Sequence, residues 1–192
     1  MAKLIVAITG TPGTGKSTFA KELSRRLRSC RVIEINSVAK EHDLYLGSDM
    51  FGSKIVDLRR LNSALRSEIR ETDKDIVIIV GHLVPELHMG QEITITLREG
   101  LKELAGRLER RGYQKEKIRE NLISEAVDYC GINSRERCER TYEIRGSKDR
   151  KMMISYLSRI SRGMKAREPS RKEIEELGEL ASLIKKENRY GL

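Results

Sequence analysis

A glycine-rich stretch between an apolar run and a helical pattern carries the strongest chemical signal in the chain. Residues 10–18 are Gly-Thr-Pro-Gly-Thr-Gly-Lys-Ser-Thr, which matches the spacing G-x-x-x-x-G-K-[ST]. Glycines let the backbone curl so that successive N–H groups point at phosphate oxygens, and the dipole of the following helix adds positive potential. The stretch therefore predicts a P-loop that binds a nucleoside triphosphate.

Two side chains of this loop have specific expected roles. We expect Lys16 to reach the β- and γ-phosphates, and the hydroxyl of Ser17 to bind Mg²⁺. The other ATP-binding residues that the loop predicts are Gly13, Thr14, Gly15 and Thr18. ATP and Mg²⁺ are accordingly the expected cofactors.

An arginine and a histidine are candidates for the reaction itself. Transfer of a γ-phosphoryl group is accelerated mainly by positioning and by cations, and one arginine can contribute about 10³- to 10⁵-fold. Arg111 is the candidate arginine, with Arg107 or Arg110 in support, although the dipole of a helix end also attracts basic residues. His82 could orient a phosphate or a water, or be a hydrogen-bonded structural residue.

Alternating strand and helix patterns must position these side chains. Apolar, β-branched runs predict strands at 4–8, 31–35, 75–80, 93–97 and 141–144. Helical spacing between them predicts an α/β P-loop NTPase fold, a parallel sheet of about five strands flanked by helices. The run 75–80 is the most continuous and is the expected central strand. It ends at His82, where open α/β sheets bind their ligands.

Small P-loop kinases add two hinged pieces to such a core, one for the phosphoryl acceptor and one that closes over ATP. Residues 36–52, expected as a short helix and a loop, and residues 107–117 occupy these places. An amphipathic helix is expected to follow the first piece, with Ile55, Leu58, Leu61, Leu65 and Ile69 on one side. The candidate acceptor-binding residues are Asn36, Ser37, Arg59 and Arg60, although an exposed helix face explains the two arginines equally well.

Basic residues are concentrated near the end of the chain. The whole sequence has 38 Lys and Arg against 29 Asp and Glu, and residues 145–172 alone have ten basic and two acidic residues. This segment indicates a polyanionic or acidic protein partner, or else a solvated pair of helices. We expect a core over 1–146 and a basic helical extension over 147–192. The sequence lacks a membrane-length apolar run, and the expected location is cytoplasmic.

Four motifs resemble, in the same order, the adenylate kinase-like ATPases of archaea and eukaryotes. They are GTPGTGKST at 10–18, INSVAKEHDLY at 35–45, VGH at 80–82 and LERRGYQKEKIRENLISE at 108–125. In eukaryotes these proteins are called isoenzyme-six adenylate kinases or coilin-interacting nuclear ATPase. The resemblance implies nucleoside monophosphate kinase activity together with ATP hydrolysis. It also implies late maturation of the small ribosomal subunit, through a platform ribosomal protein near the 3′ end of the small-subunit RNA.

Position by position, the resemblance places the monophosphate-binding piece at 36–52 and a short lid at 111–121, with Arg111 in the R-G-Y motif. His82 matches the histidine that follows the family's central strand. The family commonly has an acidic residue two positions before that histidine, and this chain has Val80 there. Asp57 or Glu34 are candidate substitutes.

Three functions stay open from the sequence. The first is an ATP-dependent nucleoside monophosphate kinase with AMP as the favoured acceptor and with ATPase activity. The second is a nucleotide-gated assembly factor that binds ribosomal protein and ribosomal RNA with little kinase activity. The third is a kinase for another small acceptor, such as shikimate or dephospho-coenzyme A. A GTPase is excluded because the guanine motif N-K-x-D is absent.

Overall fold

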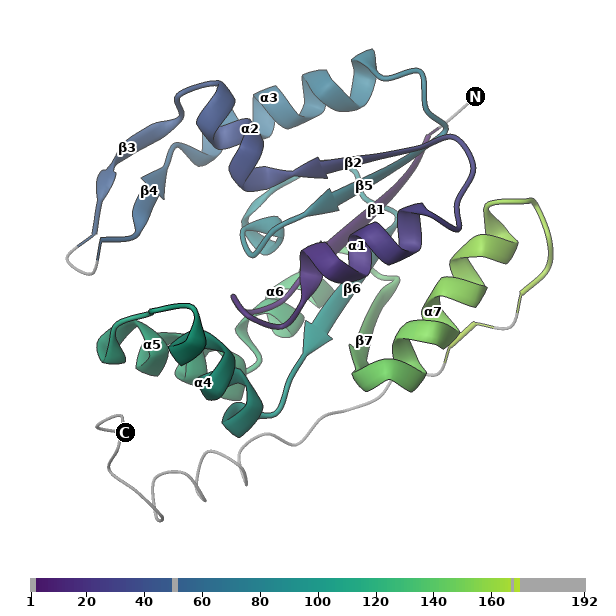
Figure 1. Cartoon of the computed structure of the whole chain (residues 1–192). Coiled ribbons are helices and arrows are strands. Elements are labelled where there is room, and N and C mark those ends of the chain that lie inside the picture. Colours follow the sequence, from purple (N-terminus) through teal and green to yellow (C-terminus); the bar gives the residue numbers. More distant parts are fainter. Residues whose placement is uncertain (1–2, 50–51, 167, 170–192) are drawn as a thin grey trace.

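A parallel sheet forms the centre of the computed structural model, which describes residues 3–49, 52–166 and 168–169. Its five described strands lie in the order β2-β5-β1-β6-β7 (Figure 1). Their bounds are Cys30–Glu34 for β2, Ile76–Val80 for β5, Leu4–Thr9 for β1, Ile93–Arg98 for β6 and Thr141–Arg145 for β7. The predicted fold class is confirmed. The middle strand is β1 rather than the expected β5, because both are buried and apolar continuity could not rank them.

Helices cover both faces of the sheet. On one face, α1 (Lys16–Ser24) and α7 (Gly146–Ile160) bury Phe19, Leu23, Met153 and Leu157 against alternate residues of the strands. On the other face, α2 (Ile35–Glu41), α3 (Leu58–Glu71) and the short helix η1 (Val84–Glu86) bury a second apolar set. Because successive side chains of a strand point to opposite faces of the sheet, the residues of each strand divide between these two apolar layers.

The segment between α2 and α3 is a hairpin, and the expectation of a loop there was wrong. Strands β3 (Tyr45–Ser48) and β4 (Lys54–Val56) pair antiparallel and project from the sheet edge (Figure 1). Ile55 lies in β4 and is 47% exposed, so it does not belong to the apolar face of α3. The helix begins after Asp57, whose carboxylate accepts a hydrogen bond from the backbone N–H of Arg60.

Helices α4 (Leu101–Arg110) and α5 (Lys115–Ala126) pack together over a separate apolar cluster beside the P-loop. The helix α6 (Tyr129–Arg137) follows directly. The spacing of Ile118, Leu122, Ala126 and Tyr129 in the sequence predicts a single helix, but the structure has two. Asp128 adopts a left-handed conformation with φ of 54° and its carboxylate caps α6, which turns the chain between the two helices.

The basic segment at the end of the chain contributes to the core. The predicted boundary between residues 146 and 147 falls at the start of α7, whose Met153, Tyr156 and Leu157 are buried in the same apolar cluster as β1. The rest of the expected helical extension, residues 170–192, lies outside the described residues. Over the part of the chain that the structure describes, no helix has the length and apolar character of a membrane span.

Candidate active site

The P-loop joins the carboxyl end of β1 to α1 and leaves the start of that helix open. Gly10 has a φ of 136°, and a Cβ atom there would lie 2.3 Å from the carbonyl oxygen of Leu97, so the turn requires glycine. Within the described residues, no side chain caps α1 and no acidic residue lies in its first turn. The first N–H groups of α1 are therefore free to bind an anion.

Lys16 is held inside the loop. Its Nζ donates hydrogen bonds to the carbonyl oxygens of Gly10 at 2.7 Å and Thr11 at 3.0 Å. Burial, together with the positive charge of Arg111, lowers the pKa of Lys16 to about 8, although Cys130, Glu125 and Glu34 act in the opposite sense. A desolvated ammonium with only neutral carbonyls as hydrogen-bond partners gains strongly from an arriving phosphate.

A buried ion pair lies directly behind the loop. Arg98, at the end of β6, is 1% exposed; its Nε donates to Glu125 Oε1 at 2.9 Å and its Nη2 to the Glu125 carbonyl at 2.7 Å. The other carboxylate oxygen of Glu125 accepts a hydrogen bond from Thr11 Oγ1. One glutamate therefore connects β6, α5 and the P-loop. The sequence analysis missed this pair, for which the only local signal is an arginine that ends an apolar strand.

Two guanidinium groups hold the loop from its outer side. Arg107 donates to the carbonyl oxygen of Gly13 at 3.3 Å and forms an ion pair with Glu99. Arg150 of α7 donates to the carbonyl oxygen of Thr14 at 3.0 Å. The sequence analysis counted Arg150 only as part of the basic segment, because its partner lies 136 positions away. Both cations lie at the edge of the expected phosphate site.

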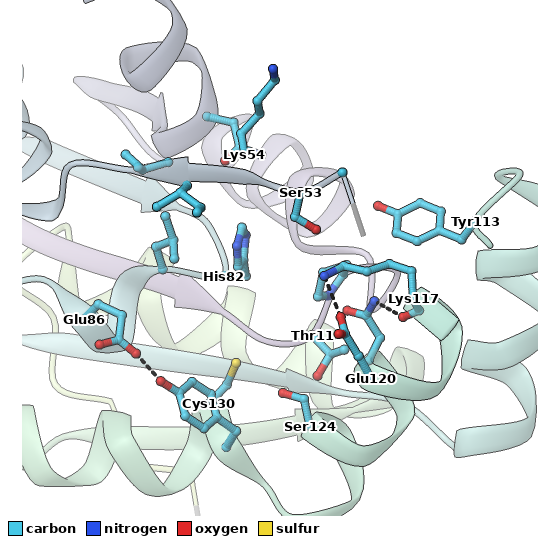
Figure 2. Close-up of a pocket in the computed structure, with 18 of the residues that line it drawn as sticks. Thr11, Ser53, Lys54, His82, Glu86, Tyr113, Lys117, Glu120, Ser124 and Cys130 are labelled. Carbon is cyan, nitrogen blue, oxygen red and sulfur yellow. Dashed lines mark hydrogen bonds and ion pairs between the residues drawn. The ribbon is translucent and has the colours of Figure 1, made fainter. Parts of the chain in front are cut away.

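A cleft of about 910 Å³ separates the β3–β4 hairpin from the α4–α5 pair (Figure 2). Its walls are formed by the start of the P-loop, the hairpin, the end of β5, and helices α5 and α6. Lys117 of α5 approaches Asp49 of the hairpin to 3.8 Å across this space and pairs with Glu120 at 2.7 Å. On the opposite wall, Tyr129 donates to Glu86. The cleft can hold a ligand next to the P-loop.

His82 lies in this cleft directly after β5 (Figure 2). Although more than a third of its surface is accessible, the cleft walls limit its hydration. This burial lowers the pKa of His82 to about 4, and the positive charges of Lys16 and Lys117 add to the shift. His82 is therefore neutral at pH 7 and can donate or accept a hydrogen bond, but it does not supply positive charge.

The structure brings some of the predicted site residues together and leaves others apart. Lys16, Ser17 and the other predicted ATP-binding residues lie together in the P-loop and the first turn of α1. Arg111 is exposed at the end of α4, and its positive charge lowers the pKa of Lys16. Asn36 and His82 line the cleft. Ser37, Arg59 and Arg60 are exposed and are not among the described residues that line it.

The donor atoms around the loop fit Mg²⁺ better than a metal that is fully enclosed by protein. The hydroxyl of Ser17 is exposed in the first turn of α1. Among the described residues, no group of three His, Cys, Asp or Glu side chains could hold a metal ion. Mg²⁺ usually keeps several waters and is bound by one or two protein oxygens together with substrate phosphates. Ser17 is the residue that would hold it here.

Comparison with known proteins agrees with this geometry. A family model described as an AAA domain matches residues 6–128. The chain is 36% identical over 142 residues to a Methanosarcina barkeri protein named "Putative adenylate kinase", with 73% of this chain and 76% of that protein covered. It is 32% identical over 167 residues to a Pyrococcus furiosus protein of the same name, with 85% and 88% covered. The chain belongs to this family.

The adenylate kinase-like family accounts for the P-loop and for the order of the elements around it. The same fold occurs in shikimate kinase from Acinetobacter baumannii, in complex with shikimate, at a TM-score of 0.54 and 14% identity, covering 84% of this chain and 94% of that one. This likeness concerns the fold alone. The choice of acceptor has to be argued from the residues of the cleft.

Proposed function

We propose that this member of the adenylate kinase-like family is an ATP-dependent nucleoside monophosphate kinase, which transfers the γ-phosphate of ATP to AMP or another nucleoside monophosphate. ATP hydrolysis accompanies the transfer when water takes the place of the acceptor. The observation that carries the proposal is the cleft of about 910 Å³, which begins at Thr11 of the P-loop and extends between the hairpin and α5. Two ligands can therefore meet beside Lys16.

The residues of the loop supply the donor half of the site. The open N–H groups at the start of α1 bind the phosphates of ATP, and Lys16 exchanges its two carbonyl partners for phosphate oxygens. Arg111 brings a second positive charge as α4 and α5 close. Ser17 would hold Mg²⁺, which would supply positive charge to neutralise part of the phosphate charge.

The cleft supplies the acceptor half. Asn36 contributes an amide at its wall, and Ser37, Arg59 and Arg60 lie on the neighbouring exposed surface, from which they can reach the acceptor phosphate once the hairpin closes. Neutral His82 positions the attacking oxygen by a hydrogen bond, without a positive charge that would compete with Lys16 for phosphate. AMP is the first acceptor to test because the relatives carry the name of an adenylate kinase.

Parallel coupled assays with AMP, CMP, UMP, shikimate and dephospho-coenzyme A test this function. We expect Mg²⁺- and ATP-dependent formation of a nucleoside diphosphate, with AMP the preferred acceptor. Phosphoryl transfer to shikimate or dephospho-coenzyme A alone would contradict the proposal. The Lys16→Met variant serves as the control, because it removes the loop cation without altering the acceptor wall.

A second function, a nucleotide-gated factor for small ribosomal subunit maturation, is favoured by one surface. While the apolar side of α7 packs on the sheet, Lys148, Lys151, Arg159, Arg162 and Lys165 are exposed along α7 and the residues after it. Such a surface can contact RNA phosphates or an acidic patch of a platform ribosomal protein. Its test is binding to small-subunit ribosomal RNA over a salt series. Glutamine at these five positions should weaken binding and flatten its salt dependence.

A further inference from the structure

Two carboxylates affect the pKa of Lys16, and among the described residues only one of them accepts hydrogen bonds. Glu125 and Glu34 both raise the pKa of Lys16. The carboxylate of Glu125 already accepts hydrogen bonds from Thr11, Arg98 and the backbone N–H of Glu99. Glu125 therefore has a structural role behind the loop, and the function of Glu34 needs a separate explanation.

Glu34 lies on the nucleotide side of the sheet. It is the last residue of β2 and pairs in register with Val80, the last residue of β5. The alternation along β2 directs it to the same face as Val32, which packs in the cluster that contains Val80 and Phe19 of α1. This face is covered by α1, whose first turn carries Lys16 and Ser17. The neighbouring strand β5 ends on this face with the aliphatic side chain of Val80. The carboxylate on this face therefore comes from Glu34 of β2.

No fold-stabilising contact explains this carboxylate. Glu34 is the N-cap residue of α2, yet its side chain makes no capping hydrogen bond. Within the described residues, the carboxylate of Glu34 forms no hydrogen bond and no ion pair, although the residue is only partly exposed. Asp57 differs, because its carboxylate caps α3. Of the two acidic candidates from the sequence, only Glu34 lies on the sheet face that α1 covers and has no structural partner among the described residues.

We propose that Glu34 is the acidic residue of the Mg²⁺–nucleotide site and accepts hydrogen bonds from water molecules of the Mg²⁺ that Ser17 and the phosphates of ATP hold. The proposal rests on the ATP binding that the proposed function requires. Mg²⁺ loses its waters reluctantly, and polarised waters form strong hydrogen bonds with a carboxylate. A glutamate on β2, which β5 separates from β1, is suited to this role because it need not enter the inner coordination shell.

The Mg²⁺ dependence of ATP binding tests this role without a phosphoryl acceptor. ATP affinity is measured by calorimetry over a Mg²⁺ series and with EDTA, for the unaltered protein, Glu34→Gln and Glu22→Gln. Glu22 is the matched control, since it is an exposed carboxylate on α1. We expect Glu34→Gln to raise the Mg²⁺ concentration at half-effect about 10-fold or more, as loss of a hydrogen-bond partner of a metal ligand does. In EDTA its ATP affinity should stay equal or become tighter, because a negative charge near the phosphates is lost.

Each other outcome has a definite meaning. An unchanged Mg²⁺ midpoint in Glu34→Gln overturns the proposal, and so does an equal loss of ATP affinity with and without Mg²⁺, which is the result of a purely structural role. If the unaltered protein shows no Mg²⁺-supported ATP affinity, the proposed function fails together with this inference. If ATP binds and no monophosphate is phosphorylated, only the proposed function fails. The spectrum of Mn²⁺ bound with ATP gives an independent readout of the altered metal environment.

Discussion

At the scale of single residues, two shifted pKa values describe the electrostatics of the cleft. Lys16 is a cation that burial and Arg111 have made easier to deprotonate, and His82 is a base that burial and two lysines keep neutral. Burial is the largest cause of both shifts, and nearby positive charges contribute to each. A phosphate bound at the P-loop would raise both pKa values.

The pKa of Lys16 predicts a pH dependence of ATP binding. The amine is charged below pH 8 in the free protein, and the phosphates of bound ATP raise its pKa. ATP affinity should therefore be constant below pH 8 and fall as the pH rises above 8, toward a tenfold loss for each further unit until the pKa of the complex is reached. Calorimetric titration at a series of pH values measures this. Lys16→Met should bind ATP more weakly with no such slope, and a slope that persists in this variant would contradict the assignment.

His82 offers a separate check through its own titration. We expect its imidazole resonance to show no titration between pH 6 and pH 8, because its pKa is about 4. Lys117→Met removes one of the two cations that lower this pKa, so the His82 midpoint should move upward. NMR titration of the His82 imidazole, in the unaltered protein and in Lys117→Met, measures this. A midpoint near 6.5 in the unaltered protein would contradict the burial argument.

At the scale of elements, the Arg98–Glu125 pair joins strand β6, helix α5 and the P-loop. Replacing Arg98 with methionine leaves the Glu125 carboxylate buried without its cation, which should lower the free energy of unfolding by about 3–5 kcal/mol. The partly exposed ion pair of Arg31 and Glu68 is the matched control, since Arg31→Met should cost about 1 kcal/mol or less. Denaturant unfolding of both variants measures the difference. Equal losses would contradict a special role for the buried pair.

The same elements show why part of the site could be predicted from the sequence. The P-loop is contiguous, so its spacing alone located Lys16 and Ser17. The contact of Thr11 with Glu125 spans 114 positions, and no local pattern encodes it. Likewise, the sequence does not distinguish Arg150 from the other basic residues, because its contact with the loop depends on the packing of α7. The hairpin β3–β4 was missed because short, largely exposed strands lack the apolar alternation that identifies a buried strand.

At the scale of the whole molecule, the cleft that we propose for donor and acceptor lies between two projections from one sheet. The hairpin and the α4–α5 pair lie on the same side of the sheet (Figure 1). Lys117 of α5 approaches Asp49 to 3.8 Å. A ligand that occupies both sites should hold them together, whereas ATP alone contacts mainly the P-loop side. Closure of this kind excludes water from the phosphoryl group and favours transfer over hydrolysis.

This arrangement predicts that two adenosines linked by five phosphates will stabilise the protein more than ATP does. At 100 times its dissociation constant, a ligand adds about 2.7 kcal/mol, and each kcal/mol raises the melting temperature by about 2–4 °C for a chain of this size. With equal concentrations and Mg²⁺, we expect a clearly larger thermal shift from the linked compound. Lys16→Met should reduce both shifts, and Arg59→Ala with Arg60→Ala only that of the linked compound. Equal shifts from the two ligands would show that the cleft does not bind an acceptor nucleotide, because the second adenosine would then add no contact.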